Sequence, residues 1–475
     1  MKKLMAVLVS VMMGLWLAGC SDAGSESSPG ADVSGGFVNE TIMPDVVDED
    51  DEEEAETENG ISIRQDVFIK EAVIYDKDDI KITATELSYE RWYAEIDFLI
   101  ENNSDKNLSF SSGSVFYNCN SVNGYMIDGG YLRSEVNAGK KAICSLSLYY
   151  DELLLCGISE IADIEISFEI MDDAYNTVYT EPAQIKTSAY DSYDYAENTY
   201  QKFVSENKWT DALEYSVNYF SDEILYEKDG IRAVSAAMVK DGDGNDILLL
   251  ELENNSEKNI YAGTGDISVN GLIIYNGGWR DYFICAGKRC ILPLDYTIMM
   301  DKSLWDVYGI DEVGSARFSL EIYDADTDEL IGSEEISINI SDNDTSFDTS
   351  GDEVYNKNDL RIISKKAVDD NSEYSDNIYI CLLAENNGTE DIAVRSVSDS
   401  FSANGYMINS SYLSETVPAG RSAVMIINIW DWNTDLDKMG ISSADDIEDY
   451  EITLRITNEQ YEEIDKAAVS VQFEK

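Results

Sequence analysis

The chain repeats one short phrase three times, and this repetition limits its fold more than any other feature. The phrase reads "FLIENNSDKNL" at 98–108, "LELENNSEKNI" at 250–260 and "LLAENNGTEDI" at 382–392. If the phrase were a reactive site the protein would carry three of them, whereas a turn within a repeated domain recurs once in each copy. The repetition therefore indicates one folding unit that occurs three times.

Four further markers accompany the phrase, in the same order in every copy. Each copy opens with an aromatic and charged segment: "VIYDKDDIKI", "ILYEKDGIRA" or "EVYNKNDLRI". After the repeated phrase comes an Asn-Gly pair, at 123–124, 270–271 and 404–405. An Ala-Gly-basic turn follows, within "NAGKKA", "CAGKRC" and "PAGRSA", and a Gly-Ile pair at 157, 309 and 440 closes the series. Markers in constant order exclude chance similarity.

The hydrophobic pattern predicts β-strands. Runs such as "KITATEL", "CSLSLYY" and "IEISFEI" alternate apolar and polar residues, as a strand with one buried face requires. Asn-Gly is the preferred pair for a tight type I′ hairpin, because both residues tolerate a positive φ. Short strands with turn signals at regular spacing are typical of antiparallel sandwiches. We therefore predict an all-β protein of three tandem immunoglobulin-like antiparallel β-sandwiches.

The repeated phrase itself is predicted to be a turn. The residues before Glu-Asn-Asn are apolar or alternating, and an apolar position comes after the phrase. Asn tolerates the left-handed backbone conformation, and its side chain bonds to nearby backbone groups. The third copy replaces Ser and an acidic residue with Gly388 and Thr389, which a turn accepts more readily than a reactive site.

Composition sets the boundaries along the chain. Residues 21–60 are rich in Ser, Gly, Asp and Glu, including "DEDDEEEAETE", and are predicted to form a disordered acidic tether. Between the first two repeats, Tyr200, Phe203 and Val204 predict a helical connector. The predicted domains are a lipoprotein signal peptide with lipobox at 1–20, the tether at 21–60, β-sandwich repeats at 61–188, 221–342 and 343–475, and the connector at 189–220.

The first twenty residues, "MKKLMAVLVSVMMGLWLAGC", have the charge, apolar core and small residues of a secretory signal peptide. Their ending, "LAGC", resembles the lipobox of bacterial lipoproteins. This resemblance implies cleavage before Cys20 and acylation of its thiol, for example with palmitate, so that the protein is an extracytoplasmic lipoprotein anchored to the cell membrane. A secreted protein with a chance cysteine at the cleavage site is the alternative.

The repeats resemble a known but uncharacterised domain. The order "YDKDDIKI", "ENNSDKN", "VNGYM", "AGKK" and "GISEIADI" is similar to the repeated immunoglobulin-like β-sandwich domain of surface lipoproteins of gut Gram-positive bacteria. The resemblance covers nearly all of residues 61–475, and it departs at Leu272, Gly388 and Asp391. It implies a fold and a location at the cell surface, and it implies no catalytic residues.

Charge and residue types narrow the classes of function. A net charge of −61 repels nucleic acid and anionic lipid surfaces, so neither is expected as a partner. The chain has no His, which removes the usual Ser-His-Asp and Cys-His arrangements and most zinc sites. Some pair of carboxylates is inevitable among 94 acidic residues, so such a pair carries no weight. We predict that the protein is not an enzyme.

Calcium is the cofactor for which the sequence offers candidate residues. "DGDGND" and "DADTDE" place oxygen ligands at alternate positions, as loops for hard cations require. Both depart from the EF-hand pattern and lie between strand-like runs, where Asp, Gly and Asn are good hairpin residues, so hairpin tips are the favoured interpretation. The candidate ligands are Asp241, Asp243, Asp246, Asp324, Asp326 and Asp328.

Six cysteines come after Cys20, and an extracytoplasmic setting permits disulfides between them. Cys285 and Cys290 flank the turn "AGKR" and are candidates to pair across a hairpin. Cys119 and Cys144 could pair within the first repeat. The alternative is that all six are small buried hydrophobic residues.

Aromatic residues near the Asn-Gly pairs are the candidates for ligand binding: Tyr125, Tyr131, Trp279, Tyr406 and Tyr412. Exposed rings stack on sugars or anchor a protein partner, but such residues more often complete the edge of a core. The favoured function is a tandem binding or adhesion module for an envelope or host-derived ligand, a glycan or a protein. The alternatives are a structural spacer or envelope-assembly lipoprotein without a specific ligand and, as the least favoured, a hydrolase on a sandwich fold.

Overall fold

The computed structural model describes part of the chain. The described residues run from 62 to 473, with gaps at 114–118, 128, 210–212, 276–278, 342, 344, 371–376, 409–410 and 431–435. The chain divides into two compact units, Met1–Glu54 and Ala55–Lys475, and all described residues belong to the second. The signal peptide with Cys20 and the tether therefore lie outside the described residues. Because the three predicted repeats share one unit, the boundaries predicted between them stay predictions.

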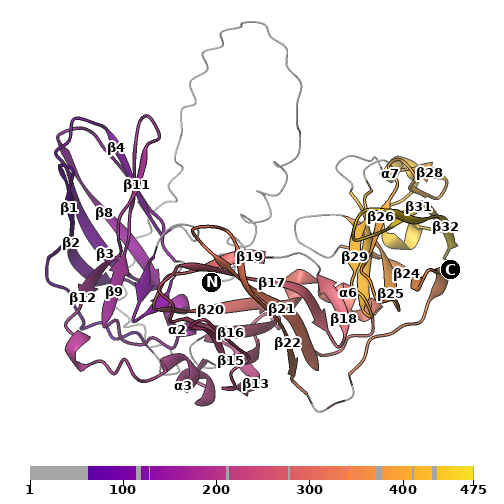
Figure 1. The fold of residues 1–475 in the computed structure, drawn as a ribbon, viewed down its shortest axis with the longest axis horizontal. Coiled ribbons are helices and arrows are strands. Elements are labelled where there is room, and N and C mark those ends of the chain that lie inside the picture. Colours follow the sequence, from indigo (N-terminus) through magenta and orange to yellow (C-terminus); the bar gives the residue numbers. More distant parts are fainter. Residues whose placement is uncertain are drawn as a thin grey trace, which may run out of the picture. The chain divides into compact units, whose positions relative to one another are not determined.

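The first repeat consists of short antiparallel sheets (Figure 1). One sheet has the strand order β1-β2-β3-β8 and another has the order β11-β10-β4-β7. Its elements are β1 (Ala72–Lys77), β2 (Ile80–Tyr89), β3 (Tyr93–Asn102), β4 (Leu108–Ser112), β5 (Ser121–Val122), β6 (Tyr125–Met126), β7 (Leu132–Val136), β8 (Lys140–Tyr149), α2 (Tyr150–Leu155), β9 (Asp163–Ile166), β10 (Glu169–Asp172), β11 (Thr177–Tyr179) and β12 (Ala183–Lys186). The segment predicted as a connector, 189–220, holds η1 (Tyr190–Ser192) and α3 (Thr199–Ser205) and also most of β13 (Ser216–Ser221), which pairs with a strand of the second repeat.

The second and third repeats place corresponding strands in the same sequence order. The second contains β13 (Ser216–Ser221), β14 (Tyr226–Lys228), β15 (Ile231–Lys240), β16 (Asp246–Asn254), β17 (Ile260–Val269), β18 (Leu272–Tyr275), β19 (Trp279–Ile284), β20 (Lys288–Asp295), α5 (Tyr296–Met299), α6 (Lys302–Val307), β21 (Ser315–Asp324) and β22 (Leu330–Asn339). The third contains β23 (Asp352–Lys357), β24 (Leu360–Asp369), β25 (Ile378–Asn386), β26 (Ile392–Ser396), β27 (Ser402–Ala403), β28 (Tyr406–Met407), β29 (Ser414–Val417), β30 (Ser422–Ile429), α7 (Leu436–Met439), η3 (Ala444–Asp446), β31 (Asp449–Asn458) and β32 (Glu463–Gln472). The prediction of an all-β, sandwich-like fold is confirmed.

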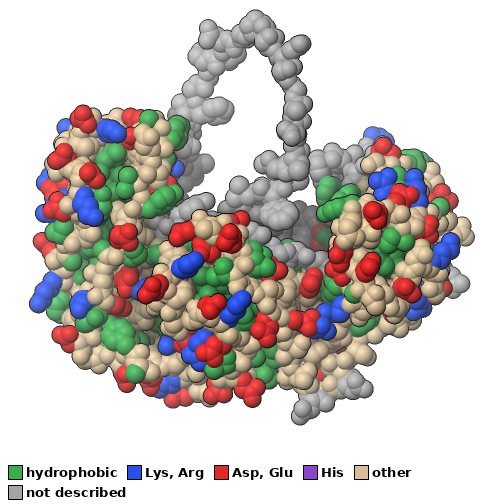
Figure 2. All heavy atoms as spheres, viewed as in Figure 1, with side chains coloured by type: hydrophobic (Ala, Val, Ile, Leu, Met, Phe, Trp, Pro, Cys, Tyr) green, Lys and Arg blue, Asp and Glu red, His purple; other side chains and the backbone are tan. Residues whose placement is uncertain are grey.

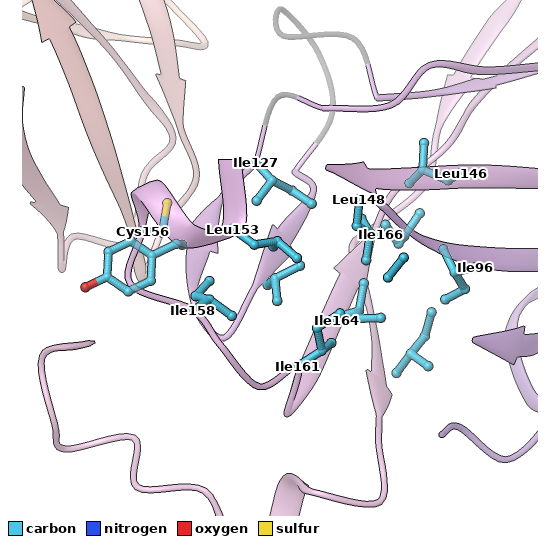
Figure 3. Close-up of a cluster of buried hydrophobic side chains, with 14 of the residues drawn as sticks. Ile96, Ile127, Leu146, Leu148, Leu153, Cys156, Ile158, Ile161, Ile164 and Ile166 are labelled. Atoms are coloured by element: carbon cyan, nitrogen blue, oxygen red, sulfur yellow. The ribbon is translucent and has the colours of Figure 1, made fainter. Parts of the chain in front are cut away.

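Each repeat has a core of branched aliphatic side chains between its sheets. In the first repeat, Ile96 on β3, Leu146 and Leu148 on β8, and Ile164 and Ile166 on β9 lie together, all of them buried (Figure 3). These residues alternate with polar ones along their strands, so one face of each strand packs inward, as the sequence pattern predicted. Burial of such a side chain contributes about 1.5–3 kcal/mol relative to exposure.

The repeated Glu-Asn-Asn phrase is a turn, as predicted, and its first Asn is the structural residue. Asn102 is fully buried, and its amide nitrogen donates to the carbonyl oxygens of Lys106 and Val136, each at 2.8 Å. Its oxygen accepts from the backbone N–H of Ser104 at 3.1 Å. Asn254 and Asn386 make the equivalent bonds. A buried amide satisfied in this way holds the end of one strand against another.

One reason given for this turn is wrong. The Asn residues of the phrase do not adopt the left-handed conformation, whereas both residues of each Asn-Gly pair do. Asn123 and Gly124 have φ of 51° and 86°, and the pairs at 270–271 and 404–405 also have positive φ at both residues. Each pair forms the predicted tight hairpin: β5 with β6, β17 with β18, and β27 with β28.

Charge is distributed over the surface. On the face shown in Figure 2, Asp and Glu side chains lie among Lys and Arg side chains and do not gather into one patch. No helix within the described residues is long and apolar enough to cross a membrane.

Candidate functional site

The Asn-Gly hairpin of the first repeat joins a strand of the second. β6 pairs with β20 in parallel, with Tyr125 opposite Arg289, and the backbone N–H of Arg289 donates to the carbonyl oxygen of Gly124 at 2.9 Å. As a result, β12-β9-β5-β6 of the first repeat and β20-β16-β15-β13 of the second form one continuous sheet. We call the Asn-Gly hairpins (β5–β6, β17–β18 and β27–β28) the docking hairpins, and the strands after the Ala-Gly-basic turns (β8, β20 and β30) the receiving strands.

The second and third repeats are joined in the same way. β18 pairs with β30 in parallel, with Leu272 opposite Ser422 and Ile273 opposite Ala423. Tyr125 and Leu272 both stand directly after an Asn-Gly pair, and Arg289 and Ser422 both stand three residues after the Ala of the turn. The two junctions therefore share one register, and the two sequence markers that define them meet at each junction.

Both junctions are buried. The Tyr125 and Leu272 side chains of the docking hairpins are buried, and so are Ile291 and Val424 on the receiving strands. Ile291 belongs to the hydrophobic cluster of the first repeat, and Val424 belongs to that of the second. Each receiving strand thus contributes to the core of the preceding repeat, which couples the stabilities of neighbouring repeats.

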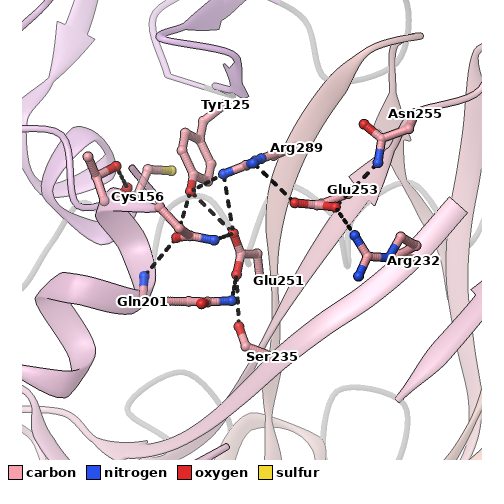
Figure 4. A network of polar contacts seen from close by, with 11 residues as sticks. Tyr125, Cys156, Gln201, Arg232, Ser235, Glu251, Glu253, Asn255 and Arg289 are labelled. Carbon is pink, nitrogen blue, oxygen red and sulfur yellow. Dashed lines mark hydrogen bonds and ion pairs between the residues drawn. The ribbon is translucent and has the colours of Figure 1, made fainter. Parts of the chain in front are cut away.

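A fully buried carboxylate, Glu251 on β16, lies at the centre of the first junction (Figure 4). Its Oε1 accepts from the amide nitrogen of Asn198 at 2.7 Å and from the Tyr125 hydroxyl at 3.2 Å. Its Oε2 accepts from Gln201 and Ser235, both at 2.9 Å. These donors come from the first repeat, the connector and the second repeat, so one charged group ties three segments together.

Arg289 supplies the positive charge of this network. Its guanidinium lies 3.1 Å from Glu253 and 4.0 Å from Glu251. Burial by itself lowers the pKa of Arg289, but the hydrogen bond to Tyr125 and the two carboxylates together raise it. Burial, and next the Glu251 charge, raise the pKa of Tyr125 far above its ordinary value, so the hydroxyl stays protonated and donates. A buried carboxylate is tolerated when its oxygens are hydrogen-bonded, and both oxygens of Glu251 are.

The connector completes the first junction. Asn198 caps α3 by accepting from the backbone N–H of Gln201 at 2.9 Å. Tyr200 is buried, and its ring meets Trp209 edge to face with a centroid distance of 5.2 Å. Trp209 donates through its ring nitrogen to the carbonyl oxygen of Leu154 at 3.1 Å. The helix predicted in this segment therefore packs on the first repeat and also positions two partners of Glu251.

A disulfide crosses the same junction, and it corrects the predicted pairing. Cys285 pairs with Cys119 of the first repeat, not with Cys290, and the two Cα atoms lie 5.9 Å apart. Cys290 and Cys144 are free cysteines, so the suggested pairing of Cys119 with Cys144 is also wrong. Burial raises the pKa of Cys290 to about 12, so its thiol stays protonated and packs as a small hydrophobic residue. The prediction missed the bond because its halves lie 166 residues apart.

The candidate aromatic residues have different environments. Tyr125 is buried in the junction and is not available to a ligand. Tyr131, Tyr406 and Tyr412 are exposed. Trp279 begins β19, opposite Thr264, and its side chain lies outside the described part of the structure. Of the three docking hairpins, only that of the third repeat presents exposed side chains, Tyr406 and Met407.

Both candidate calcium loops are hairpin turns. The first is the β15–β16 turn, where Asp241 accepts from the backbone N–H groups of Asp243 and Asn245, at 3.0 and 2.7 Å. Asp246 pairs with Lys240 at 2.7 Å. The second is the β21–β22 turn.

In the second turn, Asp324 accepts from the backbone N–H of Asp326 at 3.0 Å and pairs with Lys258. Asp328 has a positive φ, as tight turns require. Within the described residues, no group of three or more Cys, Asp or Glu side chains is placed to hold a metal ion.

Two of the cavities in the described part of the structure are lined by residues of the third repeat. One, of about 330 Å³, is lined by residues of the second and third repeats, including Ile273, Glu415 and Val424. The other, of about 360 Å³, is lined by residues including Asp369, Asp437 and Ser443. In the second cavity Asp369 accepts from the backbone N–H of Ala444 at 2.6 Å, which is a structural contact.

Comparison with known proteins gives no family. No family model matches the chain, and no curated protein matches it. Among solved structures, red sea bream transglutaminase has a TM-score of 0.16 and 8% identity over 55% of this chain, and the chain spans 31% of that enzyme. A protein of unknown function from Porphyromonas gingivalis W83 has a TM-score of 0.13 and 9% identity, over 48% of this chain and 91% of the other.

The BSP domain of a biofilm associated protein has a TM-score of 0.12 and 9% identity, over 88% of this chain and 67% of the other. Likenesses this weak carry no argument about activity. The chain is therefore characterised by its own geometry: an all-β, sandwich-like protein whose repeats dock in series through Asn-Gly hairpins.

Proposed function

We propose that the protein is a non-enzymatic, lipid-anchored surface protein that binds a polypeptide partner through the docking hairpin of its third repeat. One observation supports this above all others: the same hairpin is buried against a strand edge in the first two repeats and carries exposed Tyr406 and Met407 in the third. Two copies of this hairpin pair with a strand inside the chain, so the exposed third copy is suited to pair with a strand of another protein.

The chemistry of the two junctions indicates the class of ligand. In both, the hairpin adds to the edge of a sheet in parallel and buries a side chain directly after the Asn-Gly pair. Peptide-binding domains use the same principle, in which main-chain hydrogen bonds give affinity and side-chain contacts give specificity. A protein with an exposed strand edge is therefore the proposed ligand, rather than a glycan.

Location and class of function rest on the sequence. The lipobox with Cys20 supports a membrane anchor outside the cytoplasm, and the net charge of −61 argues against a nucleic acid partner. The absence of His from the chain argues against the common hydrolase mechanisms. A spacer without a ligand is the second candidate, and it is favoured by the use of two docking hairpins to join the repeats.

A pull-down separates these functions. Residues 21–475, without the signal peptide and the lipid-carrying Cys20, are presented to envelope proteins, cell-wall polysaccharide and mucin glycans. We expect retention of a protein that is lost in Tyr406→Asp and Met407→Asp, because a buried charge opposes docking. Tyr131→Asp changes an exposed tyrosine outside the hairpin and should retain the protein.

Each other result would overturn the proposal. Retention by a glycan, abolished by Tyr412→Ala, would support the glycan module instead. No retention in any arm, with the variants folded by circular dichroism, would support the spacer.

A further inference from the structure

In the described structure, β8, the receiving strand of the first repeat, is an edge strand with no docking hairpin beside it. β8 ends its four-stranded sheet, whereas β20 and β30 each lie between a strand of their own repeat and a docking hairpin. Ile143 on β8 corresponds to Ile291 and Val424, since each stands five residues after the Ala of its turn. The exposed fractions are 76% for Ile143, 8% for Ile291 and 6% for Val424. Within the described residues, nothing covers the position that docking buries twice elsewhere.

The docking hairpin of the third repeat is the other half of such a junction, and it too lies at the edge of its sheet in the described structure. Tyr406 and Met407 are 47% and 51% exposed, whereas Tyr125 is 3% exposed and Leu272 is fully buried. An exposed β-strand edge or hairpin of this kind is a ready site for pairing with another chain. The series of repeats therefore has one open receiving strand and one open docking hairpin of the same design.

Charge also matches between the two open halves. At the first junction, Lys288 of the turn pairs with Glu165 on β9 at 2.5 Å. Lys140 occupies the position of Lys288 in the first repeat, two residues after the Ala of the turn. Glu451 corresponds to Glu165, because each is paired with the Ser of its hairpin, Glu165 with Ser121 and Glu451 with Ser402. Lys140 and Glu451 are both exposed.

We propose that the partner is a second copy of this chain, which associates head to tail. β28 of one copy pairs in parallel with β8 of the next, with Tyr406 opposite Lys141 and Met407 opposite Ala142, and covers Ile143. This register is the one that both internal junctions use. The inference rests on the proposed function, because it names the ligand of the same hairpin.

The contact joins two different surfaces, so it is heterologous and continues from copy to copy until a ring closes or the filament ends. An isologous dimer is not expected. The contact between copies lacks both the Cys119–Cys285 bond and the covalent connection that raises effective concentration within the chain. Association is therefore expected to be reversible and to increase with protein concentration.

Sedimentation velocity of residues 21–475, which lack the signal peptide and Cys20, measured over a wide range of concentrations, tests the assembly. We expect the average mass to rise past the dimer as concentration increases. Ile143→Lys and Met407→Glu each place a charge in the contact and should each give monomers. Val178→Lys is the control, because Val178 is an exposed residue on another edge strand of the first repeat and should leave assembly unchanged.

Mixing the two variants distinguishes a heterologous contact from any other. Ile143→Lys keeps its docking hairpin, and Met407→Glu keeps its receiving strand. Each alone should be monomeric, whereas the equimolar mixture should form a heterodimer that grows no further. A mixture that stays monomeric would overturn the proposal, as would assembly that both variants leave intact.

A disulfide designed on the first junction gives an independent readout. Asn137 occupies the position of Cys285, directly before the Ala of the turn, and Ser400 occupies that of Cys119, four residues before the Asn of the Asn-Gly pair. The double variant Asn137→Cys, Ser400→Cys should form a ladder of covalent oligomers on a non-reducing gel. Either single variant should form no ladder.

Adding Ile143→Lys to this double variant should abolish the ladder, and a ladder that persists would exclude docking at β8. Ile143→Lys also separates this inference from the proposed function, because β8 has no part in binding a different protein. A different protein captured equally by wild type and Ile143→Lys, while wild type stays monomeric in sedimentation, would support the function and overturn self-assembly.

Discussion

The first and third docking hairpins have the same sequence, Asn-Gly-Tyr-Met, and opposite environments. Tyr125 is buried and bonded to Glu251, whereas Tyr406 is exposed. Their backbones are alike, with positive φ at both residues of each Asn-Gly pair. The difference therefore arises from the neighbouring repeat: the first hairpin docks on the receiving strand β20 of the second repeat, and no receiving strand pairs with the third hairpin in the described structure. Local sequence forms the hairpin, and a neighbour decides whether it becomes a junction.

The largest expected effect comes from removing the disulfide at the first junction, where the docking hairpin is buried. Cys119→Ser opens a disulfide whose ends are 166 residues apart, and closing a loop that long is worth about 5 kcal/mol of unfolding free energy in the chain-entropy model. Urea unfolding of wild type and variant measures the loss. Cys144→Ser, at a free and only half-buried cysteine, is the control. An equal loss in both variants would show that the bond does not stabilise the junction.

The second junction gives the next effect. Leu272→Ala removes a fully buried side chain from a docking hairpin and should cost about 3 kcal/mol, from lost burial and the cavity that remains. Tyr406→Ala changes the corresponding exposed residue and should stay within about 0.5 kcal/mol in dilute solution. Denaturant midpoints of the two variants provide the measurement. Similar costs would mean that the third hairpin is as well packed as the second.

A smaller effect tests the charge at the first junction. Glu251→Gln keeps the shape of the side chain but turns its amide nitrogen toward donors, so one or two bonds are lost at about 1–2 kcal/mol. Glu385→Gln is the control, since that carboxylate pairs with Arg361 at 2.9 Å near the surface. Hydrogen exchange of the β6 amides should increase in Glu251→Gln alone. Unchanged exchange would mean that the Cys119–Cys285 disulfide, and not Glu251, keeps β6 paired with β20.

The smallest expected effect is a loss of stability in acid that arises from Asp348, between β22 and β23. Side-chain and backbone hydrogen bonds from Ser350, and then Lys365, lower the pKa of Asp348 to about 2. A lowered pKa stabilises the folded state above the unfolded value, near pH 4, and that contribution is lost as the pH falls toward 2. The effect is small because the Asp348 side chain is 45% exposed and screened by solvent.

Unfolding of wild type and Asp348→Asn, monitored from neutral to acid pH, measures this contribution. The wild type should be the more stable at neutral pH, and the difference should vanish near pH 2. If the stability difference persists at low pH, it arises from the hydrogen bonds of Asp348 and not from its charge.

Much of the fold could be predicted from local pattern. Alternation predicts strands because one face of each must be buried, and Asn-Gly predicts hairpins because both residues accept a positive φ. The buried Asn102, Asn254 and Asn386 bear out the interpretation of the repeated phrase as a turn, although through side-chain bonds rather than a left-handed backbone. These features depend on residues close together in the chain.

The junctions were not predicted. The signals were present: Glu251 interrupts an apolar run, and Cys119 and Cys285 lie beside an Asn-Gly pair and an Ala-Gly turn respectively. The missing information was the rule that one marker docks on the other in the next repeat. Position beside an Asn-Gly pair does not distinguish a ligand-binding aromatic from a buried one, and Tyr125, predicted to bind a ligand, is buried in the first junction.

The sequence by itself determined the repeats, their strands and their hairpins, because propensity and hydrophobic alternation act over a few residues. Only the tertiary structure decided which hairpin meets which strand, which cysteines pair, and which of two identical Asn-Gly-Tyr-Met segments remains exposed. The physical reason is that burial depends on surfaces brought together from distant parts of the chain. An exposed Ile143 and a buried Ile291 occupy equivalent positions, and only the presence of a neighbouring hairpin distinguishes them.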